Sequence, residues 1–346
     1  MKDADSNITE KVQALSDIEL AVLLCLITEQ HCIIETDEPS LDLLAQEIKL
    51  TTTLDDFGKG ILVNDEVDEY FDSVNGAGDS ELSNSYNKYG RRMTKSFIPL
   101  DSRRIANIVI AKNLNRAASQ VQVQGLELMR GKRNYTRTAV HAAPKPFLFI
   151  ALNASGTARL NAHLNDQFFI SHKHQTEDGL PNLEELQDNE AVSEDDASLA
   201  SVVRSPPEVF EKRDSSVSFS MEDLNDLTAR MGQVKISSEV RAYLHNIVVF
   251  MRLHRAVAGG ISAMATRHLN TLSLALAPLH GLDYITPSLV ALAARKIYPH
   301  RIAITAPENE RSMQWGSSLE AVRTILAGIT VEQVIEEVLE SVEVPL

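Results

Sequence analysis

The 346-residue chain has a formal net charge of −15, and 44% of its residues are hydrophobic. This length allows two domains or one domain with a large appendage, and the hydrophobic share is ordinary for a soluble globular protein. The negative charge argues against nonspecific binding to nucleic acid or to an anionic membrane surface.

Two features near the N-terminus bear on the cellular compartment. The apolar run at 20–27 is too short for a membrane span and lacks the flanking residues of a signal peptide. Cys25 and Cys32 cannot form a disulfide framework and lie in apolar sequence, so we expect buried thiols in a reducing compartment. The sequence therefore predicts a soluble protein of the cytoplasm or another intracellular compartment.

Helical and strand patterns alternate through the first half of the chain. Apolar spacing predicts helices at 9–26, 39–50 and 119–129. Short apolar runs predict buried strands at 31–34, 105–111, 147–152 and 168–172. Strands that alternate with helices indicate an α/β fold with a mostly parallel sheet and flanking helices.

Two segments have the composition of loops. Residues 64–96 are rich in Asp, Glu, Asn, Ser and Gly, which predicts a long loop or a disordered insertion. Residues 177–196 contain nine acidic residues and no Lys or Arg. This acidic stretch indicates a flexible, solvated linker that continues to about residue 218.

The rest of the chain is helical in pattern. Ser220 is expected to cap a helix at 221–231, with Asp223 completing a capping box. Further helices are expected at 239–258, capped by Ser237 or Ser238, at 262–279, and at 287–298, which Thr286 and Pro287 would begin. An amphipathic helix or helix pair is expected at 318–342.

Six short motifs occur in a characteristic order. In the first half they are Ile108-Val-Ile-Ala-Lys-Asn-Leu-Asn-Arg-Ala117, Pro146-Phe-Leu-Phe-Ile-Ala-Leu-Asn153 and Leu160-Asn-Ala-His-Leu-Asn-Asp-Gln-Phe-Phe-Ile170. In the second half they are Gly260-Ile-Ser-Ala-Met-Ala265, Gly281-Leu-Asp-Tyr-Ile-Thr-Pro287 and Pro299-His-Arg-Ile302. This order resembles the AAA+ ATPases of the MoxR and magnesium-chelatase subunit I branch, over somewhat under half of the chain.

The resemblance implies a fold and a division into domains. The fold would be an AAA+-like α/β core with a mostly parallel sheet, followed by a helical lid domain. The core would occupy residues 1–176, the acidic linker 177–218 and the helical lid 219–306. Residues 307–346 would form a C-terminal amphipathic helix region. The region before Phe57 is short for this family, so one strand at the edge of the sheet is expected to be missing.

The phosphate-binding loop of this family has no counterpart in the expected place. Such a loop uses glycines, backbone N–H groups and a lysine to hold phosphates. After the strand at 31–34 the chain reads Glu35-Thr-Asp-Glu-Pro-Ser-Leu41, which has no Gly and no Lys. The nearest similar sequence, at 90–96, lacks the second Gly and follows a polar loop, so we interpret it as a basic surface turn.

The resemblance also locates the positions that would handle charge during ATP hydrolysis. Lys112 and Asn113 replace the family's acidic pair, Gln167 replaces its Arg finger, and Met264 replaces its sensor-2 Arg. We expect Lys112 to neutralise Glu35 or Asp37 across the altered site. Mg²⁺ prefers anionic oxygen ligands, and neither Lys112 nor Asn113 supplies one. Since the other positions that handle charge in ATP hydrolysis have also changed, no catalytic residue is assigned.

Two further residues are candidates for binding a cofactor. Asn153 matches the family's sensor-1 position, and Arg267 lies one turn beyond Met264. The simpler interpretations are an Asn at the end of a strand and a solvated Arg on a helix. Asn115 and Arg116 match the family's strand-exit turn, where local hydrogen bonding would explain them.

Two histidines close together in the sequence are candidate metal ligands. His172 and His174 would lie on the same side of a strand, but the sequence shows no third ligand in a known motif beside them. No metal site is therefore predicted.

The functional expectation is a degenerate AAA+-like scaffold that binds protein partners, AAA+ relatives or further copies of itself, without ATP hydrolysis. One alternative is a magnesium-chelatase-type ATP-dependent motor subunit, which would use ATP and Mg²⁺. A second alternative is a nucleotide-binding module without turnover. No nucleic-acid or membrane partner is expected.

Overall fold

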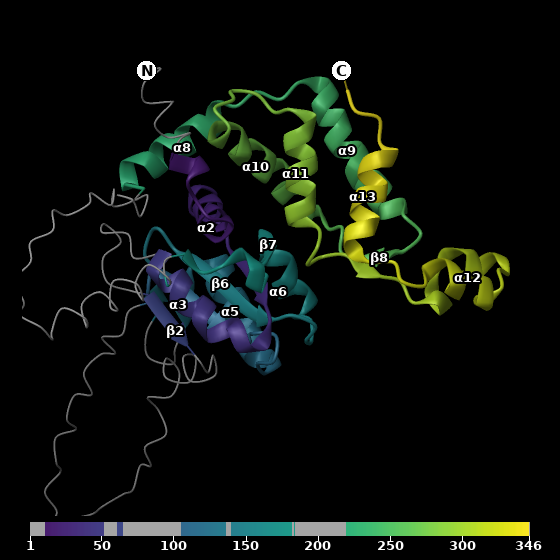
Figure 1. The fold of residues 1–346 in the computed structure, drawn as a ribbon, viewed down its shortest axis with the longest axis horizontal. Coiled ribbons are helices and arrows are strands. Elements are labelled where there is room, and N and C mark those ends of the chain that lie inside the picture. Colours follow the sequence, from purple (N-terminus) through teal and green to yellow (C-terminus); the bar gives the residue numbers. More distant parts are fainter. Residues whose placement is uncertain are drawn as a thin grey trace, which may run out of the picture.

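The computed structural model describes residues 11–51, 61–64, 105–135, 140–181, 183 and 219–345. Within them the chain forms an α/β core and a helical domain beside it (Figure 1). The predicted polar loop beyond residue 64, the basic turn at 90–96 and most of the predicted acidic linker lie outside the described residues.

The core is built on a five-stranded sheet in the order β2-β3-β6-β1-β7, in which every neighbouring pair is parallel. Its strands are β1 (Cys32–Thr36), β2 (Ile61–Asn64), β3 (Ile108–Lys112), β6 (Leu148–Ala154) and β7 (Ile170–Lys173). The α/β prediction is confirmed, and four of the strands fall where apolar runs predicted them. The expectation of a missing edge strand is wrong, because β2 pairs with β3 at the edge.

Alternate residues of the strands divide the core into two hydrophobic faces. Helices α2 (Asp17–Ile27) and α3 (Leu41–Thr51) cover one face, in a cluster that contains Ile34, Ile110 and Ile150. Helices α5 (Ser119–Gly131) and α6 (Ala162–Gln167) supply residues to the cluster on the other face. A parallel sheet buried on both faces explains why its strands read as continuous apolar runs.

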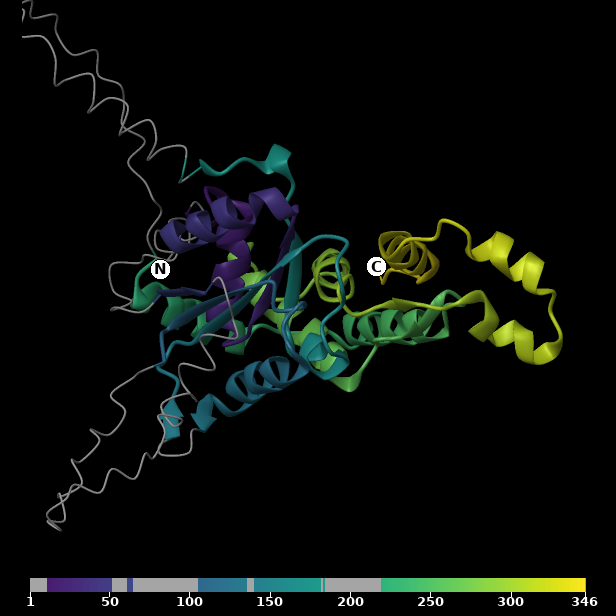
Figure 2. The same cartoon turned by 90° about the horizontal axis from the view of Figure 1, so that it is seen from below.

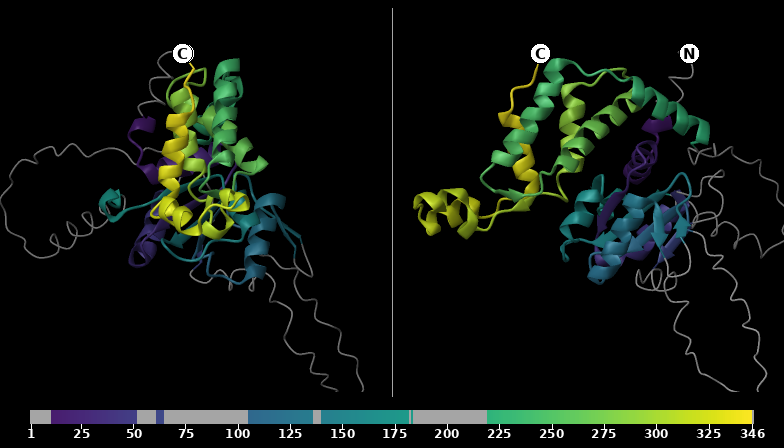
Figure 3. Two further views of the ribbon diagram at one scale, coloured as in Figure 1. Left: turned by 90° about the vertical axis from the view of Figure 1, so that its right-hand side faces the viewer. Right: turned by 180° about the vertical axis from the view of Figure 1, so that it is seen from behind.

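The helical domain contains six α-helices among the described residues. They are α8 (Met221–Gln233), α9 (Ser238–Leu253), α10 (Ala263–Leu279), α11 (Pro287–Ile297), α12 (Leu319–Leu326) and α13 (Val331–Ser341). Ser220, Ser237 and Thr286 each accept a hydrogen bond at a helix start, as predicted, and Ser220 with Asp223 forms the expected capping box. The C-terminal region is a helix pair, and Figures 2 and 3 show α12 projecting away from the other helices.

Short elements complete the described structure. They are the hairpin of β4 (Arg133–Tyr135) and β5 (Val140–Ala142), the pair β8 (Val257–Gly259) and β9 (Ala303–Ile304), and the 3₁₀ turns η1 (Glu38–Ser40), η2 (Thr176–Asp178), η3 (Pro307–Asn309) and η4 (Arg311–Trp315). Helix α9 was predicted to reach residue 258 but ends at Leu253, because the chain turns into β8, which pairs with β9. The helix predicted at 9–26 is interrupted: residues 11–13 are helical, the chain then turns, and α2 begins at Asp17 with Ser16 as its cap.

Two sequence-based expectations concern the N-terminal segment. Cys25 and Cys32 are buried free thiols, as predicted. None of the helices in the described ranges has both the length and the apolar character needed to cross a membrane.

His31, just before β1, is expected to make stability depend on pH. Its Nδ1 accepts a hydrogen bond from the backbone N–H of Phe149 at 3.2 Å, and burial lowers its pKa to about 4. The unfolded chain binds this proton near pH 6.5, so the stabilising effect is complete above that pH and is lost as pH falls toward 4. Between pH 7 and pH 5 this residue should account for a loss of about 2 kcal/mol in unfolding free energy.

Urea unfolding of wild-type protein and of the variant His31→Gln at several pH values measures this contribution. The difference between the two proteins isolates His31 from the other buried histidines. Equal pH slopes for wild type and variant would contradict the prediction.

Candidate functional site

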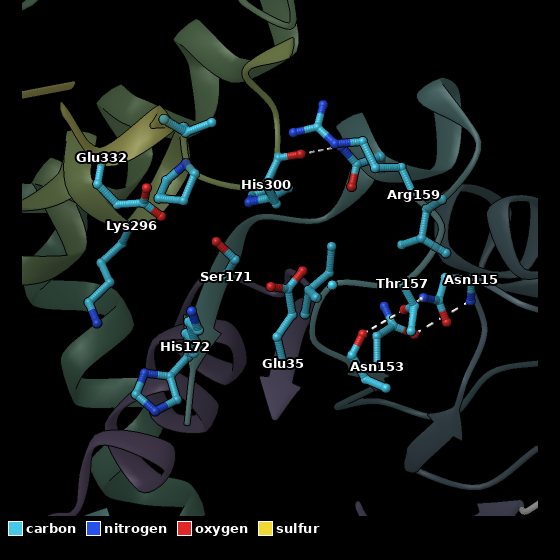
Figure 4. Close-up of a pocket in the computed structure, with 18 of the residues that line it drawn as sticks. Glu35, Asn115, Asn153, Thr157, Arg159, Ser171, His172, Lys296, His300 and Glu332 are labelled. Carbon is cyan, nitrogen blue, oxygen red and sulfur yellow. Dashed lines mark hydrogen bonds between the residues drawn. The ribbon is translucent and has the colours of Figure 1, made fainter. Parts of the chain in front are cut away.

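The carboxyl ends of the sheet strands face the helical domain across a cavity of about 600 Å³. The core contributes the ends of β1, β6 and β7, and the helical domain contributes the end of α11 and the start of α13 (Figure 4). In open α/β sheets, ligands usually bind in a crevice at this edge. The cavity is therefore the first place to look for a binding function.

Both signs of charge occur on the cavity wall. Glu35 enters from β1, Lys173 from β7 and Lys296 from α11, while Arg159 comes from the loop after β6. Burial raises the pKa of Glu35, and the charges of Lys173 and Arg159 act in the opposite direction. The Arg159 guanidinium also donates to the carbonyl oxygen of Ile302 at 2.7 Å, so it joins core to helical domain.

Asn153, the sensor-1 candidate, is buried at the end of β6 and lines this cavity. Its side-chain oxygen accepts from the backbone N–H of Asn115 at 3.4 Å. The Asn115 amide group in turn donates to Thr157 Oγ1 at 2.5 Å and to the carbonyl oxygen of Ala158 at 2.9 Å. These bonds hold together the chain segments that leave β3 and β6, which is a structural role (Figure 4).

The connection from β1 to α3 is where the sequence resemblance implies a phosphate loop. It contains only Asp37–Ser40, most of it in the 3₁₀ turn η1. Pro39 has no backbone N–H to donate, and the N–H of Ser40 already bonds the carbonyl oxygen of Asp37 at 3.0 Å. Asp37 and Glu38 add carboxylates, so this connection lacks the row of free N–H donors that binds phosphate.

Two cationic side chains follow or end strand β3, which is separated from β1 by β6. The ammonium group of Lys112 lies 2.6 Å from Asp42 Oδ1, in the first turn of α3. Arg116 Nη1 lies 2.6 Å from Glu38 Oε1, and this contact lowers the pKa of the Glu38 carboxyl. The sequence-based hypothesis named Glu35 or Asp37 as the partner of Lys112, whereas the observed ion pair is with Asp42.

The other predicted positions lie apart from one another. Asn113 follows β3 with a φ of 51° and has a buried side-chain oxygen without a hydrogen-bond partner. Gln167 ends α6, and Met264 is half-buried at the start of α10. Arg267 is exposed on α10, where its guanidinium contacts Met264 Sδ at 3.5 Å. Asn153 and Arg267 line different pockets, so the structure does not combine the two cofactor candidates in one site.

The residues that join the two domains lie within the quoted sequence motifs, but their pairing was not predicted. Asp166 Oδ1 accepts from the hydroxyl of Ser262, the N-cap of α10, at 2.7 Å, and also lies 3.4 Å from Arg301 Nε. Asn165 Nδ2 donates to the carbonyl oxygen of His300 at 2.7 Å. Nothing in the sequence pattern marks these pairs, because their members are separated by more than ninety positions.

The sequence analysis also did not identify Asp178 as a potential third metal ligand beside His172 and His174. His172, His174 and Asp178 bring potential metal-ligating atoms to within 4.8 Å of one another. The spacing His-x-His-x-x-x-Asp was the available signal, but Asp178 had been assigned to the acidic linker.

Three similarities to known proteins bear on this arrangement. Residues 249–322 match the AAA lid domain family. The structure resembles a crystal structure from Cytophaga hutchinsonii described as a candidate ATPase, with a TM-score of 0.60 and 19% sequence identity over 99% of this chain and 94% of that chain.

A curated relative is the "Maintenance of telomere capping protein 2" of Lachancea thermotolerans. It is 28% identical over 113 residues, which make up 31% of this chain and 40% of that protein. The match therefore spans less than half the length of the relative.

A parallel-sheet core joined to an AAA lid defines a protein with the AAA+ fold. The fold class and the AAA+ resemblance expected from the sequence motifs are confirmed at this level. The lid match extends beyond residue 306, where the sequence had placed the end of the lid, to residue 322.

Proposed function

We propose that this protein is an AAA+-fold scaffold that binds or assembles with other proteins and does not hydrolyse ATP. The observation that carries the proposal is the ion pair between Lys112 and Asp42, at 2.6 Å. The Lys112 cation lies where the resemblance to AAA+ ATPases implies a carboxylate, and Asp42 neutralises it from within the chain.

The charges at the end of β3 disfavour Mg²⁺. An ATPase of this class needs carboxylate oxygens at the end of this strand to hold the ion and to orient the attacking water. The side chain of Lys112 is only 11% exposed. Its ammonium group is held close to the protein, and it would repel a divalent cation at this position.

The connection after β1 disfavours the phosphates of a nucleotide. Asp37 and Glu38 repel a triphosphate at the connection after β1, and Pro39 and Ser40 have no free N–H to offer it. The polarity of a working site is thus reversed: its loop is acidic and its strand end is basic. The ion pairs Lys112–Asp42 and Arg116–Glu38 stand in place of the contacts that a nucleotide and its metal would make.

A binding titration and an activity assay test whether the protein binds and hydrolyses ATP. A fluorescent ATP analogue is titrated with and without Mg²⁺, and phosphate release is measured with ATP. We expect no saturable Mg²⁺-dependent binding at millimolar nucleotide and no turnover above a protein-free blank. Mg²⁺-dependent saturation with phosphate release would overturn the proposal and support the motor-subunit alternative.

One observation favours nucleotide binding without turnover as a second candidate. Arg159, Lys173 and Lys296 are among the residues that line the cavity, and they could hold an anionic ligand. This function predicts Mg²⁺-independent binding that weakens in Lys296→Ala. The control variant is Arg323→Ala, whose exposed guanidinium pairs with Glu308 on the projecting C-terminal segment. Equal binding by both variants would exclude the cavity as the binding site.

The scaffold role itself requires partners. Light scattering of the purified chain, alone and mixed with AAA+ relatives, measures assembly directly. Telomere capping, the process in the name of the Lachancea relative, is one context in which to seek protein partners. A chain that stays monomeric and captures no AAA+ relative would remove the support for assembly.

A further inference from the structure

We propose that His172, His174 and Asp178 form a site for one Zn²⁺ ion, or a chemically similar divalent transition metal. The site lies at the end of β7, on the border of the cavity between core and lid. It is independent of the scaffold function, because none of its residues takes part in the ion pairs that replace the nucleotide contacts.

The backbone brings the three ligands together. Side chains two positions apart on a strand point to the same side, so β7 and its continuation present both imidazoles together. The chain then turns through η2, where the backbone N–H of Gln175 donates to Asp178 Oδ2 at 2.8 Å. This capping bond holds the Asp178 carboxylate close to the two rings.

The distances between the potential ligand atoms are slightly longer than those around a bound zinc ion. One ligand atom from each residue lies within 4.8 Å of the others, and His174 Nδ1 lies 3.8 Å from Asp178 Oδ2. Zinc bonds of about 2.0–2.2 Å in a tetrahedron put neighbouring ligand atoms roughly 3.4 Å apart. Small side-chain rotations would therefore complete the coordination.

Unsatisfied nitrogens point to a missing ligand. His172 Nε2 and His174 Nδ1 are both buried without a hydrogen-bond partner, in residues only 6% and 5% exposed. Leaving such an atom unpaired typically costs about 1–3 kcal/mol. The separation of 3.8 Å between His174 and Asp178 is too long for a hydrogen bond, so the carboxylate does not resolve the problem. A metal ion would engage both nitrogens and the carboxylate at once.

The ligand set selects the class of metal. Two imidazole nitrogens and one carboxylate suit Zn²⁺ and related transition metals, whereas Mg²⁺ and Ca²⁺ prefer oxygen ligands. Three protein ligands leave one position for water or for an anionic group of a bound molecule.

Charged residues on the helices that face His172 also affect the binding of a cation at this site. Lys296 on α11 and Asp17 at the start of α2 both line the cavity and act on His172 with opposite sign. Figure 4 shows Lys296 on the same side of the cavity as His172. Lys296 disfavours a bound cation, and Asp17 offsets it. The charge of Asp178 then remains as the attraction that the site offers to a divalent ion.

The test uses the full chain freed of metal by dialysis against a chelator. Zn²⁺ is titrated in competition with a chromophoric chelator, and bound metal is counted by elemental analysis. We expect one equivalent bound with a micromolar or lower dissociation constant. Asp178→Asn should weaken binding at least tenfold, and His174→Ala about a hundredfold or more. The matched control His163→Ala removes an exposed histidine on α6 and should bind like wild type.

The same variants also show whether a loss of metal binding is caused by misfolding. Asp178→Asn keeps an oxygen that can accept from the N–H of Gln175, and the Asp178 side chain is 47% exposed, so this variant should fold normally. Zn²⁺ should raise the melting temperature of wild type and His163→Ala but not of Asp178→Asn. Wild type that binds well below one equivalent, or Asp178→Asn that binds and is stabilised like wild type, would overturn the proposal.

Discussion

Replacing Arg301 with alanine is expected to lower the free energy of unfolding by about 3–5 kcal/mol. The Arg301 side chain is 1% exposed, although it carries a charge. Its guanidinium donates to backbone carbonyl oxygens on both sides of the joint between core and lid: those of Asp166, Phe168 and Phe169 in the core and that of Ile297 in α11. Removing it takes a donor from each of these buried oxygens, of which that of Phe168 keeps its contact with His300 Nε2 at 3.3 Å, and leaves Asp166 without its cation.

The charge of Arg301 survives burial because of its partners. Burial lowers its pKa to about 10, the Asp166 carboxylate acts in the opposite direction, and the group stays protonated at neutral pH. Arg301 Nη2 lies 2.7 Å from His268 Nδ1, and burial together with this cation lowers the pKa of His268 to about 3. His268 is therefore neutral and accepts the bond. Arg301→Lys keeps the charge without the planar fork of donors, so it should recover only part of the loss.

Chemical unfolding followed by circular dichroism measures the effect. The control is Arg323→Ala, since Arg323 and its partner Glu308 are 60% and 54% exposed. An exposed pair of this kind is worth less than about 1 kcal/mol. If Arg301→Ala were no more destabilised than the control, the guanidinium would not hold core and lid together.

The main elements of the fold could be predicted because their signals are local. Apolar runs identified β1, β3, β6 and β7, and polar caps identified the starts of α8, α9 and α11. Strand β2 could not be found in the same way. It is only Ile61–Asn64, set in polar sequence, and its pairing with β3 depends on a contact more than forty positions away.

The ion-pair partner of Lys112 could not be predicted from the sequence for a different reason. Glu35 and Asp37 follow or end β1, which is two strands from β3 because β6 lies between them. At about 4.8 Å per strand, that is roughly 10 Å between strand axes. Helix α3 leaves β1 and packs against β6 and β3, and its first turn brings Asp42 to Lys112. The sequence identified the altered charge, but the direction of the next helix decided its partner.

Asp178 was missed for a related reason. Acidic composition placed it in a linker, and composition carries no information about the single turn η2 that returns its carboxylate to the histidines. Positions that depend on local chemistry were therefore found, whereas groups brought together by a turn or a helix crossing were not. The cavity between core and lid contains positions of both kinds. The sequence therefore identified the residues that differ from the AAA+ motifs, but it did not identify the residues that they contact.

Replacing Gly260 with alanine should destabilise the lid by on the order of 4 kcal/mol or more, with the loss arising entirely in the backbone. Gly260 has a φ of +103°, a conformation that residues with a Cβ atom adopt only with strain. An added Cβ would collide with the carbonyl oxygen of Arg301 and lie 2.6 Å from its carbonyl carbon. Because the obstacle is backbone, no side-chain rotation can relieve it.

Gly259 offers a matched control one residue earlier. An added Cβ there meets nothing within 4 Å, and Gly259 is not among the glycines with positive φ. Gly259→Ala should therefore change the unfolding free energy by less than about 1 kcal/mol. Similar unfolding midpoints for the two variants would show that the close approach of Gly260 to Arg301 is not a constraint on the fold.

The double variant Gly260→Ala with Arg301→Ala connects the two predictions. The Cβ of the first variant pushes on the backbone of the residue whose guanidinium joins lid to core, so each change damages the same joint. Residues that share a contact give non-additive effects of about 0.5–3 kcal/mol. We expect the double variant to lose less stability than the sum of the two single losses, because displacement of the Arg301 backbone already disturbs the hydrogen bonds that the second substitution removes.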